Sequence, residues 1–500
     1  MKKVCAVCLC LVMGLTLWAC AAGEAPKAPD YILEGFDGDN SNHEWETNLF
    51  FARMEERTGI SFQFRQIKDY TQWEERKRAI LAGEDLPDVL FKAGLTPADT
   101  EQMYTAGIIM DLKPYLEAYA PDLWALLHEH EEWMEAVTMP DGSIPALPGI
   151  NELPNNDVPW INTVWLDRVK MDVPTTAEEL TEVLRAFRDN DPNRNNRADE
   201  VPLTFIGFWE LRFLGHAFGI VDNDYYVSVE DGRVVSHLTA AENRTFLEWL
   251  HLLWEERLID RHGFNNSDTL RQITDEKAAI PYGVMLSTTP LSVVPGAALE
   301  QYAVMDPLTW KGKQVYRNLL GEMTRGAFAL TKNCPEPEKM IAWVNTLYTE
   351  EGSRLALNGL EDVDYRWNED GTWEWVNDVN TVANVTLPQA TIGEGGTIPG
   401  MIRADFQLKY AEKQTRTMVE QLHGFLEKCV NPYPLVFLSR EDRDRIAQLQ
   451  AGIAAYADQT MTSFVTGDLA LNDATWAEFT TRLGQLGLDE MVSIWQKYIH

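Results

Sequence analysis

The order of apolar and polar residues over the first hundred positions predicts alternating strands and helices. Short apolar runs, typical of buried strands, lie at 31–33, 60–64 and 87–91. Between the first two runs, Trp45, Leu49 and Met54 lie on one helical face, and a second helix is expected over 73–81. This β-α-β-α-β order predicts a parallel sheet covered by helices, and therefore an α/β fold.

A second round of alternation begins near residue 160, and the chain ends in helices. The apolar segment 164–166 precedes Thr176 and Glu179, whose spacing fits the capping box of a helix start. A strand is expected at 203–206, and the aromatic pairs on either side of 368–371 predict a hairpin. Amphipathic helical stripes contain Leu180, Leu184 and Phe187, then Phe246, Leu250 and Leu253, and near the end Ile446, Leu449, Ile453 and Tyr456, followed by Trp476, Phe479, Leu483 and Leu486.

The length and the charge of the chain limit its architecture and its partners. With 500 residues, 45% of them hydrophobic, the chain is too long for one compact core, so two lobes are expected. A formal net charge of −34 repels phosphate backbones, and we therefore expect no nucleic-acid partner. The charge serves solubility or attracts a cationic ligand, and the sequence leaves both interpretations open.

The first 20 residues have the pattern of an export signal. Two lysines precede an uncharged apolar run over 4–18, which is short for a membrane span but has the length of a signal core. The run ends in Ala19-Cys20, which resembles a bacterial lipobox. The resemblance implies a signal peptide over 1–19, cleavage before Cys20 and lipidation of its thiol. Trp18 is bulkier than such a motif usually shows, so an ordinary secretory signal is the alternative.

The order and spacing of several short segments resemble the extracellular solute-binding proteins of bacterial ABC importers. The resemblance is to the sugar-binding class, in its LplA-like and alginate-binding branch. The segments that carry it are Thr58-Gly59-Ile60, Leu81 to Val89, Asp111 to Leu116, Trp165-Leu166-Asp167, Pro174-Thr175-Thr176, Leu258-Ile259-Asp260, Phe464 to Gly467 and Leu486 to Asp489. Each segment alone is a weak signal, and their common order makes the resemblance specific.

This resemblance implies a two-lobed, periplasmic-binding-protein-like clamp of type II, with a sheet flanked by helices in each lobe, a hinge and a helical C-terminus. After a lipidated N-terminus and linker over 20–29, one lobe is expected to contain 30–158 plus 316–395, and the other 159–315 plus 396–500. Cys334 and Cys429 would then lie on opposite lobes, so we expect free thiols. The implied function is delivery of a carbohydrate, an oligosaccharide in particular, to the permease subunits of an ABC importer. We expect a monomer, anchored by lipid alone to the outer face of the bacterial cell membrane.

The segment from Asp191 to Glu200 is the most specific local motif. Its oxygen-bearing residues are spaced as in an EF-hand loop, and Ca²⁺ prefers six to eight hard oxygen ligands. The candidate ligands are Asp191, Asn193, Asn195, Arg197 through its backbone carbonyl, Asp199 and Glu200. Position 12 of the motif is Pro202 and position 6 is Asn196, which both depart from the EF-hand pattern. A similar loop in the alginate-binding branch supports a structural Ca²⁺, and the alternative is an Asn-rich turn held by its own hydrogen bonds.

A sugar site combines aromatic planes, which cover the C–H faces, with polar side chains that bind the hydroxyl rim. In open α/β sheets such side chains follow the carboxyl ends of strands. The segment around Arg325 leads into an expected strand at 327–330. The ligand-binding candidates are Asp37, Asn40, Asn42, Trp160, Trp209, Glu210, Tyr282 and Arg325.

The sequence favours a binding protein over an enzyme. It contains neither a G-x-S-x-G motif nor a P-loop. His128 and His130 are two residues apart and do not share a helix face, so a solvated helix end is favoured over a metal site. Two alternatives stay open: the same clamp binding a peptide or another solute, and a secreted glycosidase with two carboxylates across a cleft.

Overall fold

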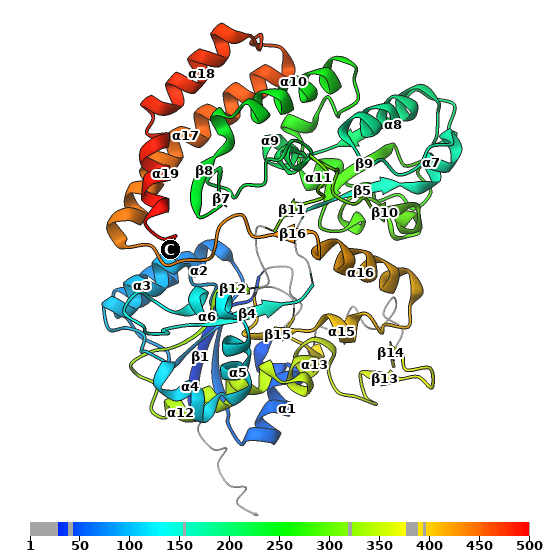
Figure 1. Ribbon diagram of the computed structural model, residues 1–500. Coiled ribbons are helices and arrows are strands. Elements are labelled where there is room, and N and C mark those ends of the chain that lie inside the picture. Colours follow the sequence, from blue (N-terminus) through cyan, green and yellow to red (C-terminus); the bar gives the residue numbers. More distant parts are fainter. Residues whose placement is uncertain are drawn as a thin grey trace, which may run out of the picture.

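The computed structural model has two lobes joined by several crossings of the chain (Figure 1). It describes residues 29–38, 44–153, 157–318, 323–376, 389–393 and 397–499. The expected signal peptide and most of the linker, including Cys20, lie outside the described residues, as do Asn40 and Asn42. No helix among the described residues is long and apolar enough to span a bilayer.

The first lobe is built on a six-stranded sheet with the order β15-β4-β12-β3-β1-β2. β12 runs antiparallel to both of its neighbours, and the other pairs in the sheet are parallel. The strands are β1 (Tyr31–Phe36), β2 (Phe62–Ile67), β3 (Val89–Phe91), β4 (Leu147–Asn151), β12 (Met323–Leu330) and β15 (Gly400–Ile402). The sheet therefore takes in β15, which lies beyond the boundary expected at residue 395.

Helices cover both faces of this sheet, because apolar side chains alternate along its strands. Leu33 and Phe91 pack into one buried cluster, and Leu90 and Ala329 pack into another. The helices are α1 (Leu49–Thr58), α2 (Tyr70–Leu81), α3 (Pro97–Thr105), α4 (Lys113–Tyr119), α5 (Pro121–Glu129), α6 (Glu131–Val137), α12 (Pro337–Asn345), α13 (Glu350–Asn358) and α15 (Ala404–Gln407). The expected hairpin forms from β13 (Tyr365–Trp367) and β14 (Trp373–Trp375).

The second lobe contains a four-stranded sheet with the order β10-β5-β9-β6. Its strands are β5 (Val158–Asn162), β6 (Val201–Thr204), β9 (Tyr282–Ser287) and β10 (Tyr302–Val304). A separate hairpin joins β7 (Val227–Glu230) to β8 (Arg233–Ser236). The helices are α7 (Thr163–Val169), α8 (Ala177–Asp189), α9 (Gly207–Leu211), α10 (Ala241–Glu255), α11 (Asp268–Arg271) and α16 (Lys413–Leu426).

Three helices at the end of the chain complete the second lobe: α17 (Arg440–Thr466), α18 (Asp473–Gln485) and α19 (Leu488–Gln496). Their apolar stripes share one buried cluster with α8 and α10. Thr176 caps α8 by accepting the Glu179 N–H, as expected, and Glu179 reaches back to Thr175. Residues 164–166, where the second alternation was expected to begin, lie in α7, and the strand of that unit is β5.

The crossings fix which sheet edges face each other. β5, which begins the second lobe, is the strand that follows β4 in the chain. Val158, at the start of β5, pairs with Ser287 at the end of β9. A short parallel pair, β11 (Tyr316–Arg317) with β16 (Cys429–Val430), lies between the lobes (Figure 1). The two-lobed α/β clamp with a hinge is therefore confirmed. Cys334 and Cys429 are both free thiols.

Candidate functional site

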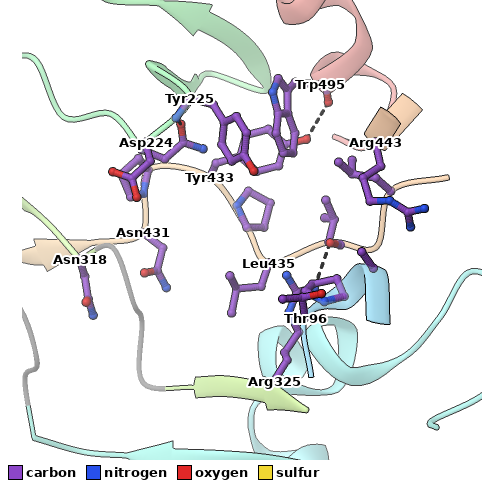
Figure 2. Close-up of a pocket in the computed structure, with 17 residues that line it drawn as sticks. Thr96, Asp224, Tyr225, Asn318, Arg325, Asn431, Tyr433, Leu435, Arg443 and Trp495 are labelled. Atoms are coloured by element: carbon purple, nitrogen blue, oxygen red, sulfur yellow. Dashed lines mark hydrogen bonds between the residues drawn. The ribbon is translucent and has the colours of Figure 1, made fainter. Parts of the chain in front are cut away.

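A cavity of about 520 Å³ lies between the lobes, beside the chain segment that leads from β16 to α17 (Figure 2). The first lobe contributes the start of α3 and of β12, and the second lobe contributes the loop before β7, the start of α17 and the end of α19. Its lining residues are Thr96, Pro97, Ala98, Asn223, Asp224, Tyr225, Asn318, Arg325, Asn431 to Val436, Leu438, Arg443 and Trp495. A solute in this cavity would contact both lobes.

Three aromatic side chains form one wall of this inter-lobe cavity (Figure 2). The Tyr433 and Trp495 rings lie 4.7 Å apart, and the Tyr433 hydroxyl donates to the Trp495 carbonyl at 2.6 Å. Tyr225 packs against Trp495 at 5.0 Å and is 37% exposed. Because Tyr433 and Trp495 are themselves buried, they fix the exposed Tyr225 ring, which offers an aromatic surface of the kind that covers the apolar face of a sugar ring.

Arg325 is the charged side chain that the first lobe contributes to the cavity. Its guanidinium donates to the Val436 carbonyl at 3.0 Å and lies 5.1 Å from the Phe437 ring. Burial lowers the pKa of Arg325 to about 10, and within the described part of the chain it forms no ion pair. Its position follows from Gly326, whose φ of 72° allows the bulge in β12 and whose added Cβ would lie 2.1 Å from the Leu95 carbonyl.

A second inter-lobe cavity, of about 330 Å³, shares Asn318, Asn431, Pro434 and Leu435 with the first. It is bounded by α6 of the first lobe and by the end of α16 in the second lobe. The segment from Asn431 to Leu435 therefore borders both cavities, and its amide and backbone groups can bond a polar solute in either.

At the carboxyl end of the first-lobe sheet, the candidate Asp37 is fully buried in a polar cluster. Its carboxylate accepts from Lys92 at 2.8 Å and from the Trp45 indole N–H at 2.7 Å. Lys92 also donates to the Ile392 carbonyl at 2.9 Å. These contacts join β1 and β3 to a distant segment, and they neutralise the carboxylate inside the protein.

At the same sheet edge, Tyr70 begins α2 just beyond β2, and its ring meets the edge of Phe36 at the end of β1. Tyr70 is 62% exposed. The sequence carried a signal for this residue, because an aromatic side chain just after a strand end is well placed for a ligand. Tyr70 is not among the ligand-binding residues expected from the sequence.

At the carboxyl end of the second-lobe sheet, Trp209 and Glu210 have opposite exposures. Trp209 is 47% exposed, whereas Glu210 is buried and accepts from Arg271 at 3.1 Å. Burial raises the pKa of Glu210 to about 8, and Arg271 opposes this shift. Burial likewise raises the pKa of Asp157 on the first crossing, again against Arg271. Trp209 is thus the solvent-facing group of this cluster.

The structure brings Arg325 alone, of the described ligand candidates, into the larger inter-lobe cavity. Trp160 is buried and donates to the Ser287 carbonyl, and it borders a separate cavity between β10 and α16. Tyr282 is buried and donates to the Arg271 carbonyl. The aromatic wall was missed, although Asn431-Pro432-Tyr433-Pro434 carries a sequence signal for a rigid aromatic turn.

The candidate calcium loop folds back on itself through side-chain hydrogen bonds. The Asp191 carboxylate accepts from the backbone N–H groups of Asn195 and Asn196, and Asp199 accepts from the side-chain amides of Asn193 and Asn195. Across the described ranges, no three His, Cys, Asp or Glu side chains gather as a metal site. Glu200 Oε1 is nevertheless buried here without a hydrogen-bond partner, which fits a cation that would take this oxygen as a ligand.

Known proteins with a similar sequence include an ABC transporter substrate-binding protein and a polysaccharide-binding protein, although no family model matches the chain. FusA of Streptococcus pneumoniae serotype 4, a fructooligosaccharide ABC transporter substrate-binding protein, is 26% identical over 96% of this chain and 95% of its own length. YtcQ of Bacillus subtilis, a polygalacturonan/rhamnogalacturonan-binding protein, is 20% identical over 76% of this chain and 79% of its own length.

Solved structures of FusA and of another solute-binding protein share the fold. FusA with kestose has a TM-score of 0.73 at 25% identity, covering 94% of this chain and 98% of FusA, and a FusA EF-hand mutant with fructo-nystose has the same TM-score and coverage at 24% identity. An extracellular solute-binding protein of Bifidobacterium longum subsp. infantis has a TM-score of 0.80 at 21% identity, with the same coverage. The resemblance to sugar-binding ABC solute-binding proteins is confirmed.

Proposed function

We propose that this chain is the solute-binding protein of a bacterial ABC importer and that it holds an oligosaccharide between its lobes. The similarity to FusA along almost the whole chain carries the proposal. The inter-lobe cavity supports it, because Tyr225, Tyr433 and Trp495 supply aromatic surface while Arg325, Asn318 and Asn431 supply polar groups. No covalent chemistry is part of the proposal: a bound solute contacts both lobes and shifts them toward a closed arrangement that the permease recognises.

Kestose is the first solute to test, because FusA was solved with it. We expect kestose at 100 times its dissociation constant to raise the free energy of unfolding by about 2.7 kcal/mol. Tyr225→Ala should weaken binding about 2- to 12-fold, since an aromatic contact is worth about 0.5–1.5 kcal/mol. Titration calorimetry with kestose measures the affinities of the wild type, of Tyr225→Ala and of the control Tyr119→Ala. Tyr119 is a suitable control because it is 44% exposed on α4 and lies outside the cavity lining.

Two results would contradict the proposal. If kestose, other neutral oligosaccharides and uronates all fail to bind while a peptide stabilises the protein, the clamp takes a different solute. If the protein cleaves an oligosaccharide into shorter products, it is a glycosidase, which is the alternative enzyme function that the sequence left open.

We further propose that Cys20 carries the lipid anchor and that residues 191–200 bind one structural Ca²⁺. The anchor is supported by the signal-like residues 1–19. The calcium site is supported by the oxygen spacing of the loop, by the unpartnered Glu200 oxygen, and by the existence of an EF-hand in FusA. Asp191, Asp199, Glu200 and the Asn193 and Asn195 side chains would hold the ion, which would cross-link the loop.

A further inference from the structure

Among the residues that the structure describes, one ion pair joins the two lobes directly. Glu101 on α3 of the first lobe binds Arg443 on α17 of the second lobe. Every other ion pair in the described part of the chain joins residues of one lobe, or joins the crossing strand β11 to the second lobe. The contact therefore reports on the arrangement of the lobes and not on the fold of either one.

The surroundings of this pair make it stronger than an ordinary surface contact. The Glu101 and Arg443 side chains are only 20% and 18% exposed, so solvent and salt screen them less than an exposed pair. Arg443 has a second, weaker acidic neighbour, Asp444, at 3.5 Å on its own helix. If the lobes moved apart here, Arg443 would keep Asp444 alone, and Glu101 would lose its cation.

The pair also borders the inter-lobe cavity. Arg443 is one of its lining residues, and the lining segment 431–438 leads directly into α17 (Figure 2). On the opposite side, Arg325 of the first lobe binds the Val436 carbonyl of the same segment. The segment is thus tied to the first lobe at Val436 directly and, through α17, at Glu101.

We propose that the Glu101–Arg443 ion pair is a latch that holds the lobes in this arrangement, in which both of them line the inter-lobe cavity, and thereby raises the affinity of that cavity for its solute. The effect on the lobes stands by itself, whereas the effect on affinity rests on the proposed function. If a ligand binds only one arrangement of the lobes, its apparent affinity falls in proportion to the fraction of molecules that have this arrangement. The latch is therefore an affinity determinant that does not need to touch the solute.

Small-angle scattering and titration with kestose on the full chain test the latch. We expect Glu101→Gln to change the ligand-free scattering profile and to weaken kestose binding roughly 5-fold or more. The exchanged pair, Glu101→Arg with Arg443→Glu, should restore the ligand-free scattering profile; its affinity is not part of the test, because Arg443 lines the cavity.

Glu490→Gln is the matched control. Glu490 on α19 binds Arg445, which lies on α17 like Arg443, at 2.6 Å, but both partners of this pair belong to the second lobe. This variant should leave the scattering profile and the affinity unchanged. The latch is overturned if Glu101→Gln scatters like the wild type, or if the exchanged pair does not restore the scattering profile. A changed profile in Glu101→Gln without kestose binding by any variant would support the latch and count against the proposed sugar.

Discussion

His216 shows how one buried side chain couples the second lobe to pH. The Leu308 N–H donates to His216 Nε2 at 2.8 Å, so the ring proton lies on Nδ1 and is donated to the Phe213 carbonyl. Both ring nitrogens are therefore occupied in the neutral form, and burial lowers the pKa of His216 from 6.5 to about 4. Protonation would break the Leu308 bond inside the core.

The expected result is an acid-sensitive stability. The unfolded chain binds a proton at His216 below pH 6.5, and the folded chain does so only below about pH 4. The contribution of His216 to the free energy of unfolding is therefore fully present above pH 6.5 and is lost as the pH falls toward 4. This group alone should lower the free energy of unfolding by about 2 kcal/mol between pH 7.5 and pH 5. Urea denaturation at both pH values measures the change.

His216→Gln should remove that part of the pH dependence, whatever it does to stability at pH 7.5. His128→Gln is the control, because His128 is exposed at the end of α5. An undiminished loss of stability in His216→Gln would show that another group is responsible.

At the residue scale, the sequence predicted which residues follow strand ends, but not which charged residues pair with each other. Asp37 and Glu210 do follow strands, as their positions indicated, but Lys92 and Arg271 neutralise them. These partners lie 55 and 61 residues away in the sequence, and pairing at that distance leaves no local pattern. The aromatic wall was missed for the same reason, because its three rings come from distant segments.

At the element scale, strong periodicity gave reliable predictions. The strands expected in the first hundred residues and the hairpin at 365–375 are confirmed, with ends displaced by up to three residues. The strand expected at 203–206 is β6, Val201–Thr204. Short strands such as β10 and β15 were not predicted, because three residues carry too little alternation and their partners lie far along the chain.

The calcium loop between α8 and β6 gives the prediction at this scale. If the loop binds Ca²⁺, adding EGTA to calcium-loaded protein should lower the melting temperature, because a ligand of the folded state stabilises it. Asp191→Asn should abolish the effect of EGTA. Asp189→Asn should retain it, since the Asp189 carboxylate binds Arg188 instead. A melting temperature that EGTA leaves unchanged in the wild type would refute the site.

At the scale of the whole molecule, length and family resemblance predicted the two-lobed clamp, and the structure confirms it. The sequence could not place the inter-lobe cavity, because its position depends on how the two sheet edges face each other. The net charge of −34 likewise does not describe the cavity: Arg443 is neutralised by Glu101, whereas Arg325 forms no ion pair with any described residue.

The lipid anchor is a prediction about the whole molecule and its place in the cell. Cys20→Ser should release the protein from the membrane fraction, because two or three acyl chains hold a protein body that a signal peptide alone does not retain. Cys10→Ser, inside the apolar run of the signal, is the control and should stay membrane-bound. Fractionation of expressing cells checks both variants. Retention of Cys20→Ser on the membrane would contradict the anchor.

The pairing of β15 with β4 has a consequence for the order in which the molecule can be made. Gly400–Ile402 must reach a strand at Leu147–Asn151, some 250 residues earlier in the chain. The first-lobe sheet therefore stays incomplete until more than three quarters of the polypeptide has emerged, whereas the second-lobe sheet already has its last strand at Val304. Such distant contacts form slowly. The lobe that begins first in the sequence thus has its sheet completed after the sheet of the second lobe, so its apolar strands stay exposed on the nascent chain and are candidates for protection by a chaperone.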